Sequence, residues 1–226
     1  MAILGRLLFF WACVLSIQIP ACAIANEASG GMADSAHRSS FQIVFLQQSW
    51  DVLHLGYETD AAFAKLRSAD WSKPLFVINV EDIESYRWST QTIQLTIPAT
   101  DRLVSALAPK AIVAEKKYGR KRSLESDMEL LGHQVFGVFV SGKPIYYGVV
   151  LDSLSQMGIG WPVSRAEVID GHAVMRLLPY QISGPSSVNY DNAAGTAQAK
   201  PKCEMCERIR DPRVAEIMVK AKVMSP

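Results

Sequence analysis

The sequence has almost no net charge. Its 226 residues include 23 Lys and Arg against 22 Asp and Glu. The first 25 residues hold one Arg and no acidic residue, so the rest of the chain balances 22 basic against 22 acidic side chains. Nucleic-acid-binding domains usually carry a clear basic excess. Bulk charge therefore does not support a nucleic acid as a partner.

The sequence also lacks a hydrophobic run long enough to cross a membrane. The longest, residues 7–19, has 13 residues, whereas a spanning helix needs about 20. One basic residue precedes this run, and Pro20 and the small residues Ala23 and Ala25 follow it. This order is typical of a secretory signal peptide. We therefore expect an exported protein, periplasmic or secreted, with residues 1–25 removed.

The same segment allows a second interpretation, a lipid anchor at Cys22. The residues before it, Ile19-Pro20-Ala21, resemble a bacterial lipobox, which would make Cys22 the acylated first residue. Pro20 departs from that pattern, which usually has a small or β-branched residue there, so cleavage after Ala25 is preferred. Membrane contact is expected only if Cys22 is lipidated.

Catalytic motifs are missing as well. Residues 137–143 match the first part of a phosphate-binding loop, but Pro144 stands where that loop needs a Ser or Thr hydroxyl. The residues after it are typical of a strand, whereas such a loop must open a helix. The motifs G-x-S-x-G, S-x-x-K and H-E-x-x-H do not occur. We therefore predict no catalytic residue, metal ligand or cofactor.

Only four cysteines are present, and Cys203-Glu-Met-Cys206 is the one motif with specific spacing. Such a pair can close a disulfide, supply half a metal site or exchange thiols. A local disulfide is preferred, because export implies an oxidising compartment and no further ligands lie nearby. A metal site and a redox-active pair are the alternatives.

Strand-like and helix-like patterns alternate along residues 41–182. Strands are predicted at 41–46, 75–80 and 92–97, and a helix at 60–69 with Ala61, Phe63, Ala64 and Leu66 facing inward. A second helix is predicted from Thr100 or Asp101 through Ala108, where Pro109 ends it. Two hairpins follow, 135–150 around the turn 141–144 and 161–178 around Asp170-Gly171. This order predicts an α+β domain with a largely antiparallel sheet, β-hairpins and a few short helices.

Between Val80 and Val150 the order is an acidic turn, a strand and a helix, then an apolar strand, a Gly-Lys turn and a strand. This part of the domain is similar in pattern to the periplasmic head of SecD-type translocase subunits. The similarity implies no activity and no site residue.

Charged residues cluster between positions 110 and 129. The basic residues Lys110, Lys116, Lys117, Arg120, Lys121 and Arg122 come first, and the acidic residues Glu125, Asp127 and Glu129 follow. The preferred interpretation is a solvated loop that runs into a helix. The alternative is a basic patch that binds lipid headgroups or an acidic partner.

The remaining segments are predicted to flank the domain. Residues 26–40 are a flexible leader, and residues 183–202, rich in small and polar residues, are a linker to the C-terminal part at 203–226. There a helix over 212–223 has an apolar stripe formed by Val214, Ile217, Met218 and Ala221. Short helices are marginal alone in water, so the stripe is expected to dock on a protein partner or to fold back onto its own sheet.

These observations favour an exported binding or scaffold protein of a bacterial envelope or secretion-related system, with a protein partner at its C-terminal helix. The alternative is an enzyme, either a thiol–disulfide oxidoreductase that uses Cys203 and Cys206 or a hydrolase.

Overall fold

The computed structural model of the protein describes residues 41–56, 59–152, 155, 158–179 and 208–225. The predicted signal peptide, leader and linker lie outside these residues, as do Cys22, Cys203 and Cys206. Within the described part, no helix has both the length and the apolar character to span a membrane.

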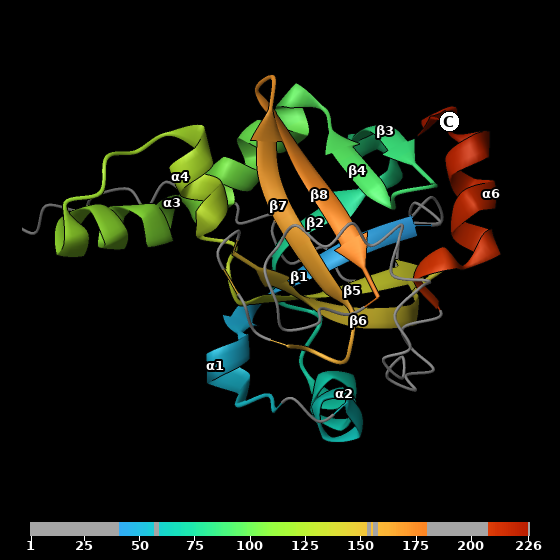
Figure 1. Ribbon diagram of the computed structural model, residues 1–226, viewed down its shortest axis with the longest axis horizontal. Coiled ribbons are helices and arrows are strands. Elements are labelled where there is room, and N and C mark those ends of the chain that lie inside the picture. The colour runs from blue at the N-terminus through green and yellow to red at the C-terminus, as the bar shows by residue number, and fades with distance from the viewer. Residues whose placement is uncertain (1–40, 57–58, 153–154, 156–157, 180–207, 226) are drawn as a thin grey trace, which may run out of the picture. The chain divides into compact units, whose positions relative to one another are not determined.

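One nine-stranded sheet organises this part of the chain (Figure 1). In spatial order its strands are β2 (Pro74–Asn79), β1 (Phe41–Ser49), β5 (Gln134–Val140), β6 (Lys143–Leu151), β7 (Val163–Ile169), β8 (His172–Leu178), β4 (Thr92–Leu95), β3 (Ile83–Arg87) and β9 (Met224–Ser225). Neighbouring strands are antiparallel except in the pairs β6–β7 and β3–β9. The predicted α+β class with a largely antiparallel sheet is confirmed.

Both predicted hairpins are present, each with a two-residue turn. Ser141 and Gly142 join β5 to β6 with φ of 49° and 73°, and Asp170 and Gly171 join β7 to β8 with φ of 50° and 80°. Two successive positive φ angles are what a type I′ turn requires, and its twist matches that of the paired strands. The near-match to a phosphate-binding loop is therefore a hairpin.

Helices of different lengths flank the sheet. They are α1 (Trp50–Leu53), α2 (Thr59–Ser68), α3 (Ile97–Tyr118), α4 (Leu124–Glu129) and α6 (Pro212–Lys220), with the 3-10 turns η1 (Val80–Asp82) and η3 (Arg208–Arg210). In Figure 1, α1 and α2 lie beside β1, β5 and β6, while α3 and α6 lie on opposite sides of the molecule.

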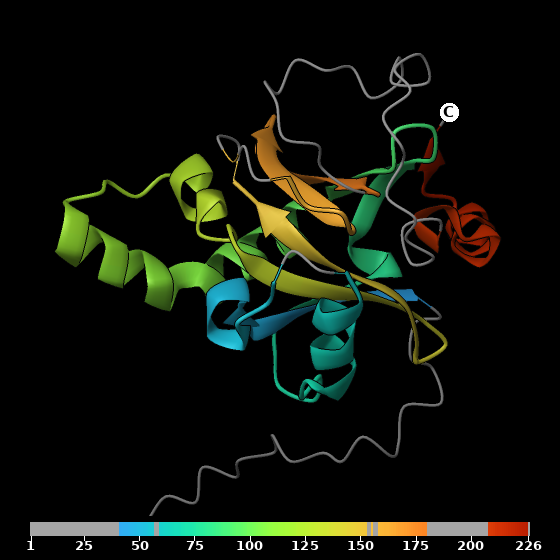
Figure 2. The ribbon, with the colours of Figure 1, turned by 60° about the horizontal axis from the view of Figure 1, so that its bottom comes forward.

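The sheet curves around a main core. Nine strands laid flat would span about 38 Å at roughly 4.8 Å per step. However, β1 and β3 are far apart in the strand order of the sheet, and yet Phe45 of β1 and Tyr86 of β3 belong to one buried cluster. Figure 2 shows the β7–β8 pair (orange) lying over β6 and β5 (yellow) and β1 (blue). Leu103 and Leu107 of α3 and Met218 of α6 complete the same cluster.

A second, smaller core lies on the other face of β1, β5 and β6, under α1 and α2. Its centre is Trp161, whose ring stacks on that of Trp50 with centroids 5.1 Å apart and meets Phe63 of α2 edge-on. The buried residues of α2 are Ala62, Phe63 and Leu66. The prediction that Ala61 and Ala64 also face inward is wrong, because the buried side of this helix is turned toward Ala62.

The helix α3 begins earlier and ends later than predicted. Its N-cap is Thr96, whose hydroxyl accepts the Ala99 N–H at 3.3 Å, and Thr100 instead lies inside the helix, where its hydroxyl accepts the Ala173 N–H of β8. Pro109 does not end the helix. Proline inside a helix removes one hydrogen bond and strains the preceding turn. Here Leu103, Leu107, Ala111 and Ala114 are buried on both sides of it, and that burial offsets the cost.

The C-terminal segment folds back onto its own domain. Asp211 caps α6, and Val214 and Met218 are buried in the main core. Beyond the helix, β9 pairs with β3, and the Tyr86 N–H donates to the Val223 carbonyl at 2.7 Å. The sequence left open whether this helix docks on a protein partner or folds back onto its own sheet, and the structure shows that it folds back. A partner contact through α6 would use its outer face, around Val219, and remains a prediction.

Candidate interaction surface

The histidines of the described part do not form a nucleophile–base pair. His133 Nδ1 lies 3.1 Å from Asp51 Oδ2, and His172 Nδ1 lies 2.8 Å from both Glu84 Oε2 and the Leu95 carbonyl. Among the residues that the structure describes, none of the three histidine rings, His54, His133 and His172, is hydrogen-bonded to a Ser, Thr or Cys side chain. The same residues contain no group of three His, Cys, Asp or Glu arranged to hold a metal ion.

The most prominent unpaired surface is the C-terminal half of α3, which extends away from the sheet (Figure 1). Seven large hydrophobic side chains are exposed in the described chain, and Ile97, Ile112, Val113 and Tyr118 of α3 account for four of them. The exposed fractions of Ile112, Val113 and Tyr118 are 58%, 62% and 71%. One helix therefore presents much of the apolar surface that the domain leaves uncovered.

The exposed residues form a regular stripe. Pro109, Ile112, Val113 and Lys116 are spaced i, i+3, i+4 and i+7, which places them on one side of a helix. Each of them is exposed. Ala111 and Ala114, on the opposite side, are buried against the domain. The helix thus has two apolar faces, and only one of them is used by the core.

Several basic residues near this stripe are engaged within the domain. Arg122 Nη2 lies 2.8 Å from Asp127 Oδ2, and Arg120 forms an ion pair with Glu129. These contacts join the loop after α3 to α4. The predicted charge cluster is thus partly neutralised by its own acidic half.

Lys110 is also engaged, at the base of the projecting segment. Its ammonium donates to the Gln134 side chain, and burial lowers the pKa of Lys110. The Gln134 amide in turn donates to the Leu46 and Gln48 carbonyls of β1. This contact attaches the middle of α3 to the sheet.

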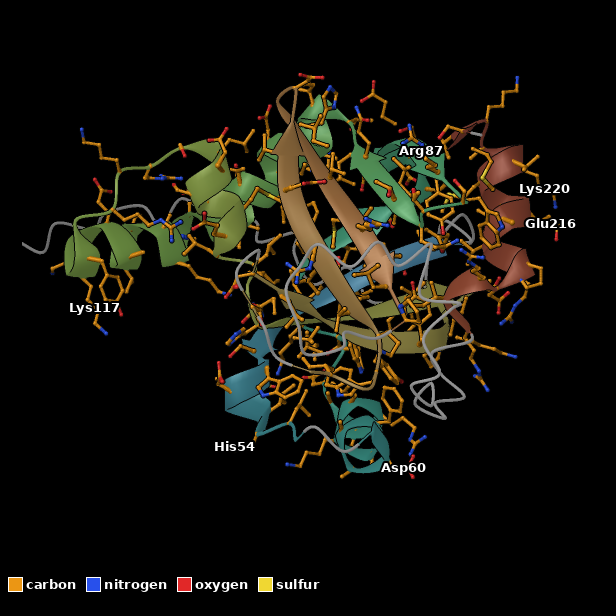
Figure 3. All side chains as sticks on the ribbon, viewed as in Figure 1. His54, Asp60, Arg87, Lys117, Glu216 and Lys220 are labelled. Carbon is orange, nitrogen blue, oxygen red and sulfur yellow. The ribbon has the colours of Figure 1, made fainter. Side chains whose placement is uncertain are left out.

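Three lysines near the end of α3, Lys116, Lys117 and Lys121, have no acidic partner among the described residues. Lys117 Nζ lies 5.0 Å from the centroid of the Tyr118 ring, which is cation–π geometry. A hydrogen bond with Tyr118 also raises the pKa of Lys117, so its positive charge is retained. Figure 3 shows Lys117 at the far end of α3.

The end of α3 is built by local sequence. Gly119 adopts φ 65° and donates its N–H to the Glu115 carbonyl, which closes the helix. Ser123 and Ser126 then form a reciprocal capping box that starts α4. A basic patch is one of the two interpretations of residues 110–129. The sequence does not predict the apolar stripe beside it, because Pro109 predicts the end of the helix there.

Comparison of the chain with known protein families, with curated proteins and with solved structures found no match. The candidate site residues drawn from the sequence, Cys203 and Cys206 for a disulfide and Cys22 for lipidation, lie outside the described residues. The α3 stripe and its lysines are therefore the surface on which a functional argument can be built.

Proposed function

We propose that the protein is an exported binding protein of a bacterial envelope that attaches to an anionic membrane surface through the end of α3. The observation that carries this proposal is the exposed stripe of Pro109, Ile112, Val113 and Lys116, flanked by lysines without acidic partners. Export rests on the signal-peptide pattern of residues 1–25.

The composition of this surface suits a membrane interface. Aliphatic side chains on one side of a helix can enter the boundary between headgroups and acyl chains, while lysines reach outward to lipid phosphates. Ile112 and Val113 supply the aliphatic side chains, and Lys116 is a lysine of the same stripe. Tyr118 is spaced i+4 from the buried Ala114, so it lies on the other side of the helix and does not belong to the stripe.

The contribution of charge can be bounded. A basic residue near an anionic bilayer contributes about 1 kcal/mol. Lys116, Lys117 and Lys121 together then contribute about 3 kcal/mol, which corresponds to roughly a hundredfold in the partition constant. Because the chain without residues 1–25 has no net charge, this attraction depends on where the lysines lie.

Vesicle co-sedimentation tests the proposal. Wild-type protein is compared with a variant in which Lys116, Lys117 and Lys121 are changed to Gln, using phosphatidylglycerol-containing vesicles. A matched control changes Lys65, Lys73 and Lys143, which lie on other parts of the surface, to Gln and so removes the same charge. We expect roughly hundredfold weaker partitioning for the α3 variant and little change for the control.

A separate variant tests the apolar half of the stripe. Ile112→Ser with Val113→Ser should also weaken partitioning, without changing its dependence on salt. Equal partitioning of the α3 and control lysine variants would contradict the proposal. Failure of the wild-type chain to bind anionic vesicles would also contradict it, and would leave an acidic protein surface as the partner of α3.

A further inference from the structure

Three arginines and a threonine form a row across four strands of the sheet. Arg165 of β7 is paired with Arg176 of β8, Arg176 with Thr92 of β4, and Thr92 with Arg87 of β3. Residues directly opposite one another in antiparallel strands point to the same face. The row therefore lies on one face, with neighbouring positions about 5 Å apart.

This face is the one turned away from the main core. Ile93 of β4, Met175 of β8 and Tyr86 of β3, the sequence neighbours of the row, all belong to the main core. Because side chains alternate along a strand, the row points outward. Arg87 is exposed, and Arg176 and Thr92 are partly exposed. Figure 3 labels Arg87 at the β3 end of the row.

Two of the guanidinium groups have no partner in the described chain. No hydrogen bond or ion pair joins the side chain of Arg87 or Arg176 to another described residue. The Arg176 Nε is also buried without an acceptor. A buried donor without an acceptor is destabilising, and like charges directly opposite each other are unfavourable.

Arg165 is held differently from the other two. Its guanidinium donates to the carbonyls of Asp152 and Ser155 at 3.2 and 3.3 Å. These bonds orient Arg165 beside Arg176. Thr92 lies between Arg87 and Arg176 in the row. Its hydroxyl is 2.8 Å from the Thr90 hydroxyl.

Two glutamates lie near the row along its strands: Glu84 is three residues before Arg87 in β3, and Glu167 is two residues after Arg165 in β7. Glu84 is engaged by His172 at 2.8 Å and by Gln94 at 3.2 Å. Glu167 is paired in register with Val174, one step along the strands from the arginines. No ion pair joins either glutamate to Arg87 or Arg176 in the part of the chain that the structure describes.

We infer that this row, the arginine row, binds a phosphate group. Guanidinium groups recognise phosphate and carboxylate through paired N–H donors. A phosphate monoester carries about −1.5 to −2 charge and three acceptor oxygens. Two unpaired guanidinium groups on either side of a hydroxyl match that charge and acceptor number better than a single carboxylate does. The inference is independent of the proposed role of α3, because it uses different residues on a different element.

Calorimetric titration of the full chain with inorganic phosphate, with acetate at the same ionic strength for comparison, tests the inference. The variants are Arg87→Gln and Arg176→Gln, and Arg67→Gln on α2 is the matched control. We expect saturable phosphate binding by the wild-type chain, at least tenfold weaker binding by both row variants, and at most a twofold change in the control. Acetate should bind at least tenfold more weakly than phosphate.

A second measurement covers the case in which Arg176→Gln does not fold. Phosphate should raise the melting temperature of the wild-type chain and of Arg67→Gln, but not that of Arg87→Gln, whose side chain is exposed. Vesicles that carry phosphatidic acid then identify the source of the phosphate. Row-dependent binding to these vesicles without binding of free phosphate assigns the row to a lipid headgroup, and the reverse assigns it to a soluble ligand.

The inference is overturned by any of three results. The first is that neither free phosphate nor phosphatidic acid binds. The second is that Arg87→Gln and Arg176→Gln bind phosphate as tightly as the wild-type chain. The third is that acetate binds as tightly as phosphate, which would make the row a carboxylate site.

Discussion

The change Met218→Ala tests whether α6 is part of the main core. Met218 is 0% exposed, and its neighbour Val219 is 60% exposed. Truncating a buried methionine costs about 2–5 kcal/mol, because the removed atoms lose their burial and a cavity remains. Val219→Ala removes only exposed atoms and places a strong helix former in the helix, so its effect should stay within about 0.5 kcal/mol.

Urea unfolding of the two variants measures this difference. With a slope of about 2 kcal/mol/M, the unfolding midpoint of Met218→Ala should fall by about 1–2.5 M. The midpoint of Val219→Ala should stay close to that of the wild-type chain. Fluorescence and far-UV circular dichroism should give the same midpoint for each variant, since a helix that belongs to the core unfolds with it.

Equal midpoints for Met218→Ala and Val219→Ala would refute this reasoning. Such a result would mean that α6 can leave the sheet without loss of stability, as a helix meant for a separate partner would. An early transition confined to helix content would lead to the same conclusion.

Three other predictions concern the core and the helix α3. Gly148→Ala should lower the melting temperature by several degrees, because the new Cβ would lie 2.9 Å from the Pro162 carbonyl and against the Phe136 ring. Tyr86 donates a hydrogen bond to the Gln91 side chain at 2.6 Å. Burial raises the pKa of Tyr86, so the folded state favours its neutral form. The contribution of Tyr86 to the free energy of unfolding is therefore complete below about pH 10 and declines above it. Tyr86→Phe should therefore destabilise the chain by about 1–3 kcal/mol at neutral pH and reduce the loss of stability in alkali, as urea midpoints on either side of pH 10 would show. Pro109→Ala should raise the melting temperature, because it restores a helical N–H; a fall would contradict this account of α3.

The parts of the fold that depend on local chemistry could be predicted from sequence. The turns at Ser141-Gly142 and Asp170-Gly171 require positive φ, and their residues tolerate it, so both hairpins follow from local sequence. The register shift between Val138 and Phe139 of β5 does not follow from it. The strand at 41–46 and the helix at 60–69 follow from hydrophobic pattern. These elements were sufficient to predict the α+β class.

The parts that depend on distant contacts could not be predicted in the same way. The sequence around Pro109 does not indicate that the helix continues past this residue, because the burial of Leu107 and Ala111 that stabilises it depends on distant parts of the chain. The pairing of β8 with β4 joins segments about eighty residues apart, and β9 pairs with β3 across a longer interval. The arginine row exists only through such pairings, so no sequence motif could have indicated it.

Hydrogen exchange along α3 tests the central claim most directly. Exchange of the amides in residues 108–122 is compared with and without phosphatidylglycerol vesicles, and residues 212–220 of α6 serve as the internal reference. We expect slower exchange in 108–122 when vesicles are present and unchanged exchange in α6, because the membrane covers only the exposed stripe. Unchanged exchange in 108–122, or protection of α6 instead, would contradict it.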